Sequence, residues 1–386
     1  MRTWPLYAAG FTTAFGAHAV AANLGGATSL MVLGALLALY DGAEVLLKPV
    51  FGSLADRVGP RPVLLGGLIA FAAASAVYVI ADSPGWLWAA RLGQGAAASA
   101  FSPAASALVA RLSPATQHGR AFGSYGFFKS IGYTLGPLLG GVLVWSGGLR
   151  LLFLVMTVLG VAVAVWVAVA VPRVPPLPRT RQTVAGLARR LADQTFLGPT
   201  SALAAATAAL SVSVGFLPVL GHEAGLGPIA TGAAVSVLAL CAALVQPRTG
   251  RALDSGRLTT RTGLFAGLLL TTVGLAAVAL PGLAGILLSA VLTGAGTGLI
   301  TPPAFAALAA STPEARLGQT MGAAEVGREL GDAGGPLLVA GVASLTTLTA
   351  GFGALALLIA GRSALSRPTR RRKSTSPDRG PRGGGS

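Results

Sequence analysis

This sequence is poor in charged residues, and in acidic residues above all. Only 10% of its 386 residues are Asp, Glu, Lys or Arg, whereas soluble domains carry about 25%. Hydrophobic residues make up 53%, and the mean hydropathy is +0.72. The apolar residues continue through whole segments of roughly 20 residues, the length that a helix needs to cross the bilayer core. The scarcity of charge excludes a string of soluble domains and predicts a membrane protein with many spans.

Cysteine and histidine are almost absent. Cys241 is the one cysteine and lies in an apolar run, which excludes a disulfide framework. The three histidines, His18, His118 and His222, are scattered, so neither a metal cluster nor a catalytic constellation is indicated. No phosphate-binding Gly-x-x-x-x-Gly-Lys-Ser/Thr loop occurs, which argues against ATP-driven transport by this chain. We expect no enzyme activity, no cofactor and no bound metal.

What the sequence does contain is a series of twelve apolar segments, separated by charges and by Pro and Gly. They predict helices at residues 5–24, 29–54, 63–81, 85–112, 119–145, 149–171, 196–220, 228–248, 261–280, 282–311, 317–342 and 344–361. We therefore expect an all-α membrane protein with two six-helix bundles, residues 1–171 and 196–361. Residues 172–195 would be a cytoplasmic linker, and residues 362–386 a disordered basic tail.

Basic residues gather on one side of the predicted membrane. The net charge is +16, and the excess falls in the linker, the tail and the loops that hold Arg57, Arg111 and Arg316, whereas Arg150 stands almost alone on the other side. The positive-inside rule places both termini in the cytoplasm, and we expect a multi-pass protein of the bacterial plasma (inner) membrane. We expect the first segment to be an uncleaved helix. The basic loops and tail fit anionic lipid better than nucleic acid.

The second half of the chain repeats the first at an offset of 199 residues. Laying residues 102–139 over 301–338 without a gap brings many Pro and Gly residues into register: Pro103 with Pro302, Pro114 with Pro313, Gly119 with Gly318, Gly123 with Gly322, Gly132 with Gly331, Gly136 with Gly335 and Pro137 with Pro336. At an offset of 198, Gly52 and Asp56 fall on Gly250 and Asp254. An even number of helices separates the copies, so both have the same orientation. Transporters are built from such parallel halves, with the solute site between them.

The turn after the second predicted helix carries a charged motif, residues 52–64 with the sequence GSLADRVGPRPVL. Asp56 can face a helix N-terminus or an arginine, and the arginines can hold lipid phosphates. The segment resembles the signature loop of the major facilitator superfamily, with Pro60 in place of one basic residue. The resemblance implies a twelve-helix transporter in which this loop latches the two halves together. Its gating residues would be Gly52, Asp56, Arg57, Gly59 and Arg61.

Two further motifs narrow the class. Residues 91–95, Arg-Leu-Gly-Gln-Gly, resemble the Arg-x-x-Gln-Gly motif of the same family. The fifth predicted helix matches the family's antiporter motif, which is associated with proton-coupled exporters, at Gly132, Gly136, Pro137, Gly140 and Gly141. The physical effect of that motif is close helix packing and a Pro kink, and packing alone is the competing interpretation. The first helix lacks the acidic residue of many drug exporters, so a drug is not predicted as the solute.

Charged residues inside the predicted spans form two clusters. A charge at the helix centre costs roughly 2.5–3.5 kcal/mol, so such residues are kept for pairing or function. One face of the second helix carries Asp41, Glu44 and Lys48, and one face of the eleventh carries Glu325, Arg328, Glu329 and Asp332. In the family these two helices meet between the halves. Together with Arg91 and Lys129, the buried charges leave about one negative charge uncompensated.

These clusters suggest a proton pathway. The hypothesis is that Asp41 or Glu325 carries the proton, with Arg91 and Arg328 as competing partners. The alternative is a purely structural ion-pair network, and sodium could replace the proton. Lys48 could snorkel to the surface. His18 and Asn23 in the first helix are possible substrate contacts.

The sequence as a whole predicts a monomeric secondary active transporter that exports a small organic solute by alternating access in exchange for protons. Uptake of a metabolite by a symporter or facilitator is the alternative.

Overall fold

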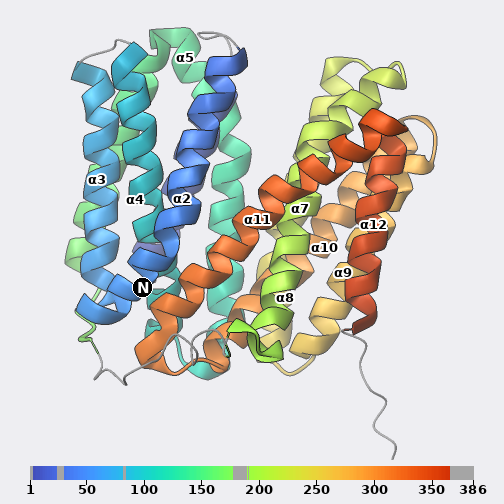
Figure 1. Ribbon diagram of the computed structural model, residues 1–386. Coiled ribbons are helices and arrows are strands. Elements are labelled where there is room, and N and C mark those ends of the chain that lie inside the picture. The colour runs from blue at the N-terminus through green and yellow to red at the C-terminus, as the bar shows by residue number, and fades with distance from the viewer. Residues whose placement is uncertain (1–2, 24–29, 81–83, 177–188, 190, 366–386) are drawn as a thin grey trace, which may run out of the picture.

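The computed structural model describes residues 3–23, 30–80, 84–176, 189 and 191–365 (Figure 1). In this part the chain forms eleven α-helices and no strand. The helices are α1 (Trp4–Asn23), α2 (Leu30–Val58), α3 (Pro60–Ile80), α4 (Pro84–Leu112), α5 (His118–Ala170), α7 (Gln194–Glu223), α8 (Pro228–Asp254), α9 (Thr260–Ala276), α10 (Gly282–Ala310), α11 (Leu317–Leu345) and α12 (Leu348–Leu365).

Helix α5 contains two of the predicted spans. Gly147 and Gly148 leave helical geometry inside it, and Gly148 has a φ of 66°, which glycine adopts without steric cost. The break falls between the predicted helices 119–145 and 149–171, so α5 supplies two segments and the prediction of an all-α membrane fold of about twelve helices is confirmed. By length and composition alone, six stretches of the described chain could span a membrane: Pro60–Ile80, Ala115–Ala170, Gln194–Glu223, Ala230–Asp254, Thr260–Ala279 and Gly282–Ala310.

The helices form two bundles that meet along two seams. Helices α1 to α5 pack together, as do α7 to α12 (Figure 1). Between the bundles, α2 packs against α11 and α5 against α8. Figure 1 shows the bundles joined at their lower end, where α11 begins, while the ribbons diverge toward the upper end.

Several helices are longer than predicted. Helix α2 continues to Val58 and α3 begins at Pro60, so the charged motif is a sharp turn at Gly59 (φ 96°) rather than a loop. Helix α8 likewise continues to Asp254. The prediction ends these helices near charged residues, but a helix that leaves the hydrocarbon can continue through such residues. The predicted tail beyond residue 365 and linker residues 177–188 lie outside the described part.

The Gly motif of α5 packs against α1. A Cβ atom at Gly132 would lie 2.6 Å from the carbonyl oxygen of Phe11, and one at Gly136 would lie 3.0 Å from that of Phe15. Gly140 and Gly141 face Ala19 and Asn23 in the same seam. Larger side chains would force the two helices apart. The second copy of the motif repeats this contact, since Gly331 and Gly335 of α11 lie against Ala204 and Ala208 of α7.

Candidate functional site

Asp56 of α2 binds the N-terminus of α11 in the other bundle. Its carboxylate accepts hydrogen bonds from the backbone N–H groups of Gly318 (2.7 Å) and Gln319 (2.8 Å). These are among the unpaired donors at the positive end of the helix dipole. Gly52 permits the approach, because a Cβ atom there would lie 2.5 Å from the carbonyl oxygen of Gly318. We call Asp56 and its two donors the first latch.

The sequence repeat produces a second latch of the same geometry. Asp254 of α8 accepts hydrogen bonds from the backbone N–H groups of Gly119 (2.8 Å) and Arg120 (2.7 Å) at the start of α5. Gly250 lies directly against Gly119, as Gly52 lies against Gly318. Both latches therefore join the bundles at the same end of the molecule.

The remaining residues of the predicted gating loop do not cross between the bundles. Arg57 is exposed. Arg61 donates a hydrogen bond from Nη2 to the carbonyl oxygen of Ala168 (2.5 Å), within its own bundle. Gly59 provides the positive φ for the turn and lies against the carbonyl of Val174.

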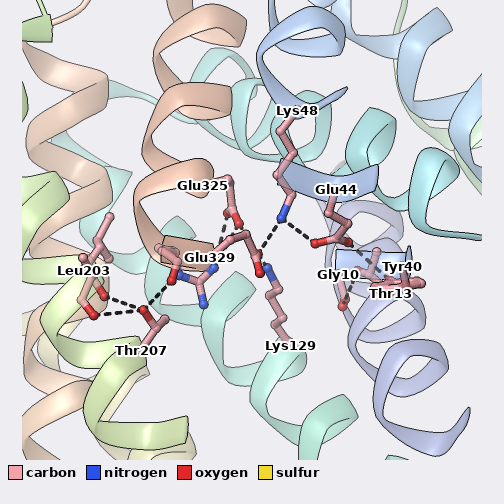
Figure 2. A network of polar contacts seen from close by, with 12 residues as sticks. Gly10, Thr13, Tyr40, Glu44, Lys48, Lys129, Leu203, Thr207, Glu325 and Glu329 are labelled. Carbon is pink, nitrogen blue, oxygen red and sulfur yellow. Dashed lines mark hydrogen bonds and ion pairs between the residues drawn. The ribbon is translucent and has the colours of Figure 1, made fainter. Parts of the chain in front are cut away.

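A buried ionic layer lies where α2 and α5 of the first bundle meet α11 of the second (Figure 2). We use this name for six side chains, Glu44, Lys48, Lys129, Glu325, Arg328 and Glu329. Figure 2 shows Lys48 of α2 between two carboxylates, Glu44 at 2.6 Å and Glu329 of α11 at 2.5 Å. Lys48 is 1% exposed, so the prediction that it could snorkel is wrong. Its Nζ is neutralised across the bundle interface instead.

Glu325 forms the other half of the ionic layer. It is fully buried and lies 3.2 Å from Arg328 of its own helix and 3.6 Å from Lys129 of α5. The contact to Lys129 is the second ion pair between the bundles. Three carboxylates face three cations in the ionic layer, so it is neutral in its ionised form. The faces predicted for the second and eleventh helices do confront each other.

The equivalent position between α5 and α8 is uncharged. The repeat places Lys48 on Gln246 and Glu329 on Ser130, and Gln246 Nε2 donates a hydrogen bond to Ser130 Oγ (2.8 Å). The two seams thus share backbone geometry and latches, but only the α2–α11 seam carries an ion pair at this level.

Asp41 and Asp332 lie outside this pairing. Both side chains are exposed, and neither forms an ion pair within the described residues. Asp41 stands 17 residues from the end of α2 and Asp332 stands 15 residues from the start of α11, about 25 and 22 Å along the helix axes. Carboxylates at such depth face water rather than lipid.

Arg91 of α4 is a buried cation that lies against Tyr40, the residue before Asp41. It is 1% exposed, and its guanidinium lies 4.3 Å from the ring centre of Tyr40. Gln94 is 3.4 Å away, a long hydrogen bond, and Nε has no partner among the described residues. The charge of Arg91 is held by an aromatic face and by carboxylates that lie further away, not by a direct ion pair.

The two predicted substrate contacts differ in their surroundings. His18 is exposed, and its ring centre lies 4.4 Å from that of Tyr133. Asn23 donates from Nδ2 to the carbonyl oxygens of Ala19 (2.8 Å) and Pro137 (3.3 Å). Asn23 therefore joins α1 to the region of Pro137 in α5, while His18 lies against Tyr133.

The sequence interpretation missed two residues that bond to the ionic layer, Tyr40 and Thr207, and the separate pair Gln246–Ser130. Tyr40 donates from its hydroxyl to Glu44 (3.2 Å), and Thr207 of α7 donates to the carbonyl oxygen of Arg328 (2.8 Å). The Gln246–Ser130 pair could have been found by extending the repeat to Lys48. Tyr40 and Thr207 carry no comparable signal in one sequence.

Comparison with known proteins identifies the class. The sequence profile of the Major Facilitator Superfamily matches residues 3–200 and again residues 200–383. The chain belongs to this family of membrane transporters, and its resemblance to the family is confirmed.

The relatives share only part of their length with the chain. An uncharacterized MFS-type transporter of Mycobacterium tuberculosis is 36% identical over 156 residues, 40% of this chain and 26% of that protein. A probable actinorhodin transporter of Streptomyces coelicolor is 34% identical over 176 residues, 45% of this chain and 30% of that protein. The match thus covers less than a third of either relative. The crystal structure of the fucose:proton symporter FucP of E. coli superposes with a TM-score of 0.77 at 12% identity, covering 95% of this chain and 98% of that one, which shows the shared fold.

Proposed function

We propose that this protein exports a small organic solute by alternating access in exchange for protons. The observation that carries the proposal is the distribution of charge along the α2–α11 seam. The six-residue ionic layer is balanced, whereas Asp41, Asp332 and Arg91 together leave one negative charge. A proton on one of the two exposed carboxylates removes that charge.

Asp41 fits the carrier role better than Glu325. Asp41 is exposed and makes no ion pair with any described residue. It follows Tyr40, whose ring lies under the guanidinium of Arg91, so the charge of Arg91 can stabilise the Asp41 carboxylate once the proton has left. Protonating Glu325 would instead leave Lys129 and Arg328 buried without their carboxylate, at a cost of several kcal/mol. We therefore assign Asp41 to proton transfer and Glu325 to holding the bundles together.

The two latches close one end of the protein. We infer from the positive-inside rule that the joined end faces the cytoplasm. With that orientation, the structure would correspond to a state that is closed toward the cytoplasm. Opening that end requires the four hydrogen bonds to Asp56 and Asp254 to break, along with the ion pairs of Lys48 with Glu329 and of Lys129 with Glu325. Asp41 lies about one helical turn before Glu44, which pairs with Lys48. This gives a physical route from proton exchange at Asp41 to opening of the ionic layer.

Export rather than uptake is supported by the complete antiporter-like motif of α5, at Gly132, Gly136, Pro137, Gly140 and Gly141. A thermal-shift screen of small organic compounds on the purified protein would identify candidate solutes. Cells that express the protein should then retain less of a true substrate than cells that express the Asp41→Asn variant. Greater accumulation in the wild type would instead establish the alternative, an uptake symporter or facilitator.

A further inference from the structure

Two pairs of side chains lie one helical turn beyond the cations that α5 and α11 contribute to the ionic layer, one pair in each bundle. In the first bundle, the ring centre of His18 of α1 lies 4.4 Å from that of Tyr133 of α5. In the second bundle, the carboxylate of Asp332 of α11 accepts a hydrogen bond from the hydroxyl of Ser211 of α7. We call these the aromatic pair and the carboxylate pair.

The sequence repeat relates the two pairs. At the offset of 199 residues, Tyr133 falls on Asp332. Each stands 15 residues after the first residue of its helix, about 22 Å along the helix axis from the latched end. An aromatic ring in one bundle and a carboxylate in the other therefore lie at the same depth.

Helices α1 and α7 complete the correspondence. The first glycine of the α5 motif lies against Phe11 of α1, and its counterpart in α11 lies against Ala204 of α7. His18 comes seven residues after Phe11, and Ser211 comes seven residues after Ala204. The aromatic pair and the carboxylate pair are thus the same position of the repeat, occupied by different chemistry.

The four side chains are accessible, although they lie beside the charged interface of the bundles. His18 and Asp332 are exposed, and Tyr133 and Ser211 are half-buried. The ring centre of Tyr133 lies 6.0 Å from the Nζ atom of Lys129, and its hydroxyl lies within hydrogen-bonding reach of the guanidinium of α11 in the ionic layer. Accessible groups beside such charges face water rather than lipid, so a solute can reach them.

The accessible charge at this depth is negative. Every cation of the ionic layer is paired with a carboxylate of that layer, and Arg91 is buried against Tyr40. Asp332 and Asp41 are exposed without an ion pair among the described residues, and they are close enough to repel each other. A solute that enters between the bundles is therefore attracted if it is a cation and repelled if it is an anion.

We propose that the solute of this transporter is an organic cation with an aromatic ring, bound between the aromatic pair and the carboxylate pair. Its cationic group pairs with Asp332, whose carboxylate is oriented by Ser211, and its ring packs against Tyr133 and His18. Aromatic side chains favour such a ligand because they stack on its ring and attract its charge. This inference rests on the proposed transport function and names the class of solute.

The test is isothermal titration calorimetry of the full-length protein in detergent, with three probes of similar size. They are naphthylmethyl-trimethylammonium, its saturated decalin analogue and the anion naphthylacetate. Wild type should bind the naphthyl cation about tenfold more tightly than naphthylacetate, the effect of one charge-assisted contact. It should also prefer the naphthyl cation to the decalin cation by about fivefold, the effect of aromatic stacking.

The variants separate the two halves of the site. Asp332→Asn should weaken the binding of both cations by about tenfold. Tyr133→Leu should remove the preference for the naphthyl cation over the decalin cation, and Tyr133→Phe, which keeps the ring, should retain it. As matched controls, Glu314→Gln removes an exposed carboxylate near the latched end, and Trp145→Leu removes an exposed ring of α5. Both controls should bind the probes as wild type does.

A wild-type protein that binds naphthylacetate as tightly as the naphthyl cation, or that binds none of the probes, would overturn the proposal. Losses in the controls as large as those in Asp332→Asn and Tyr133→Leu would do the same. If Asp332→Asn fails to fold, the wild-type preferences and Tyr133→Leu decide the outcome. Binding is measured without a proton gradient, so a protein that binds the cation but moves no protons would contradict the exchange mechanism alone. A protein that exchanges protons for an anion would contradict this proposal alone.

Discussion

At the scale of single residues, two carboxylates that look alike in the sequence have different surroundings in the structure. Asp41 and Glu325 both lie on charged helix faces, and spacing alone could not distinguish their roles. The structure buries Glu325 between two cations and leaves Asp41 exposed without an ion pair among the described residues. The difference arises from which helices pack against each face, and one sequence does not contain that information.

Glu325→Gln should therefore be a stability mutation. It leaves Lys129 and Arg328 buried and facing a neutral amide, and breaking a buried pair in this way costs about 3–5 kcal/mol. Asp41→Asn is the matched control, because an exposed substitution without a partner changes stability by only about 0.5 kcal/mol. Thermal unfolding of the purified variants in the same detergent measures both. Equal unfolding midpoints for the two variants would contradict the assignment of Glu325.

The grouping of charged residues on one face of each helix was the most predictable part of the site. The periodicity of α2 and α11 brought seven charged residues onto two faces, and the structure places those faces together. The choice of Glu329 as partner for Lys48 could not be predicted, because snorkelling to the surface is equally compatible with the position of Lys48 in α2.

At the scale of helices, close backbone contact sets the distance between the bundles. Gly52→Ala would place a Cβ atom 2.5 Å from the carbonyl oxygen of Gly318, so α2 and α11 must separate. We expect this variant to favour the state that is open at the latched end. Gly42→Ala is the control on the same helix, since a Cβ atom there has no neighbour within 4 Å.

The separation can be measured with spin labels. Val58 and Glu314 are exposed near the latched end, one on each bundle, and Val58→Cys with Glu314→Cys in a Cys241→Ser background gives one labelled pair. Gly52→Ala should shift the distance distribution to longer values, whereas Gly42→Ala should reproduce wild type. An unchanged distribution in Gly52→Ala would show that this glycine contact does not hold the seam.

The two latches should act in parallel. Asp56→Ala and Asp254→Ala each remove an acceptor of two backbone hydrogen bonds between the bundles, so either should populate the opened state and the double variant should do so more. The same label pair reports the populations. If Asp56→Ala increases the opened population and Asp254→Ala does not, the second latch does not stabilise the closed state.

The second latch shows how far the repeat extends into structure. The match of Gly52 and Asp56 to Gly250 and Asp254 predicted a related turn, but the sequence around Asp254 has lost most of the motif. The contact of Asp254 with the start of α5 depends on the continuation of α8 to residue 254, whereas the sequence predicted a helix that ends at residue 248.

At the scale of the whole molecule, the equivalent α2–α11 and α5–α8 seams differ in charge. The fold was predictable because hydropathy, charge sidedness and the in-register Pro and Gly residues all point to two parallel halves. The difference in charge between the two seams was not predictable, because it depends on which side chains pack across the bundles. Lys48 with Glu329 is ionised, while Gln246 with Ser130 is neutral. We infer that the charge-dependent part of the coupling lies in the contacts of α11 with α2 and α5, whereas the α5–α8 seam contributes uncharged contacts that must also open.

Proton-driven solute movement in proteoliposomes tests this account most directly. With an acidic lumen, wild type should accumulate an identified solute against its gradient while protons leave. Asp41→Asn, which cannot release a proton at that position, should at most equilibrate the solute, with stability unchanged. Accumulation by Asp41→Asn equal to wild type would contradict the assignment of Asp41 as proton carrier, and with it the proposed coupling mechanism.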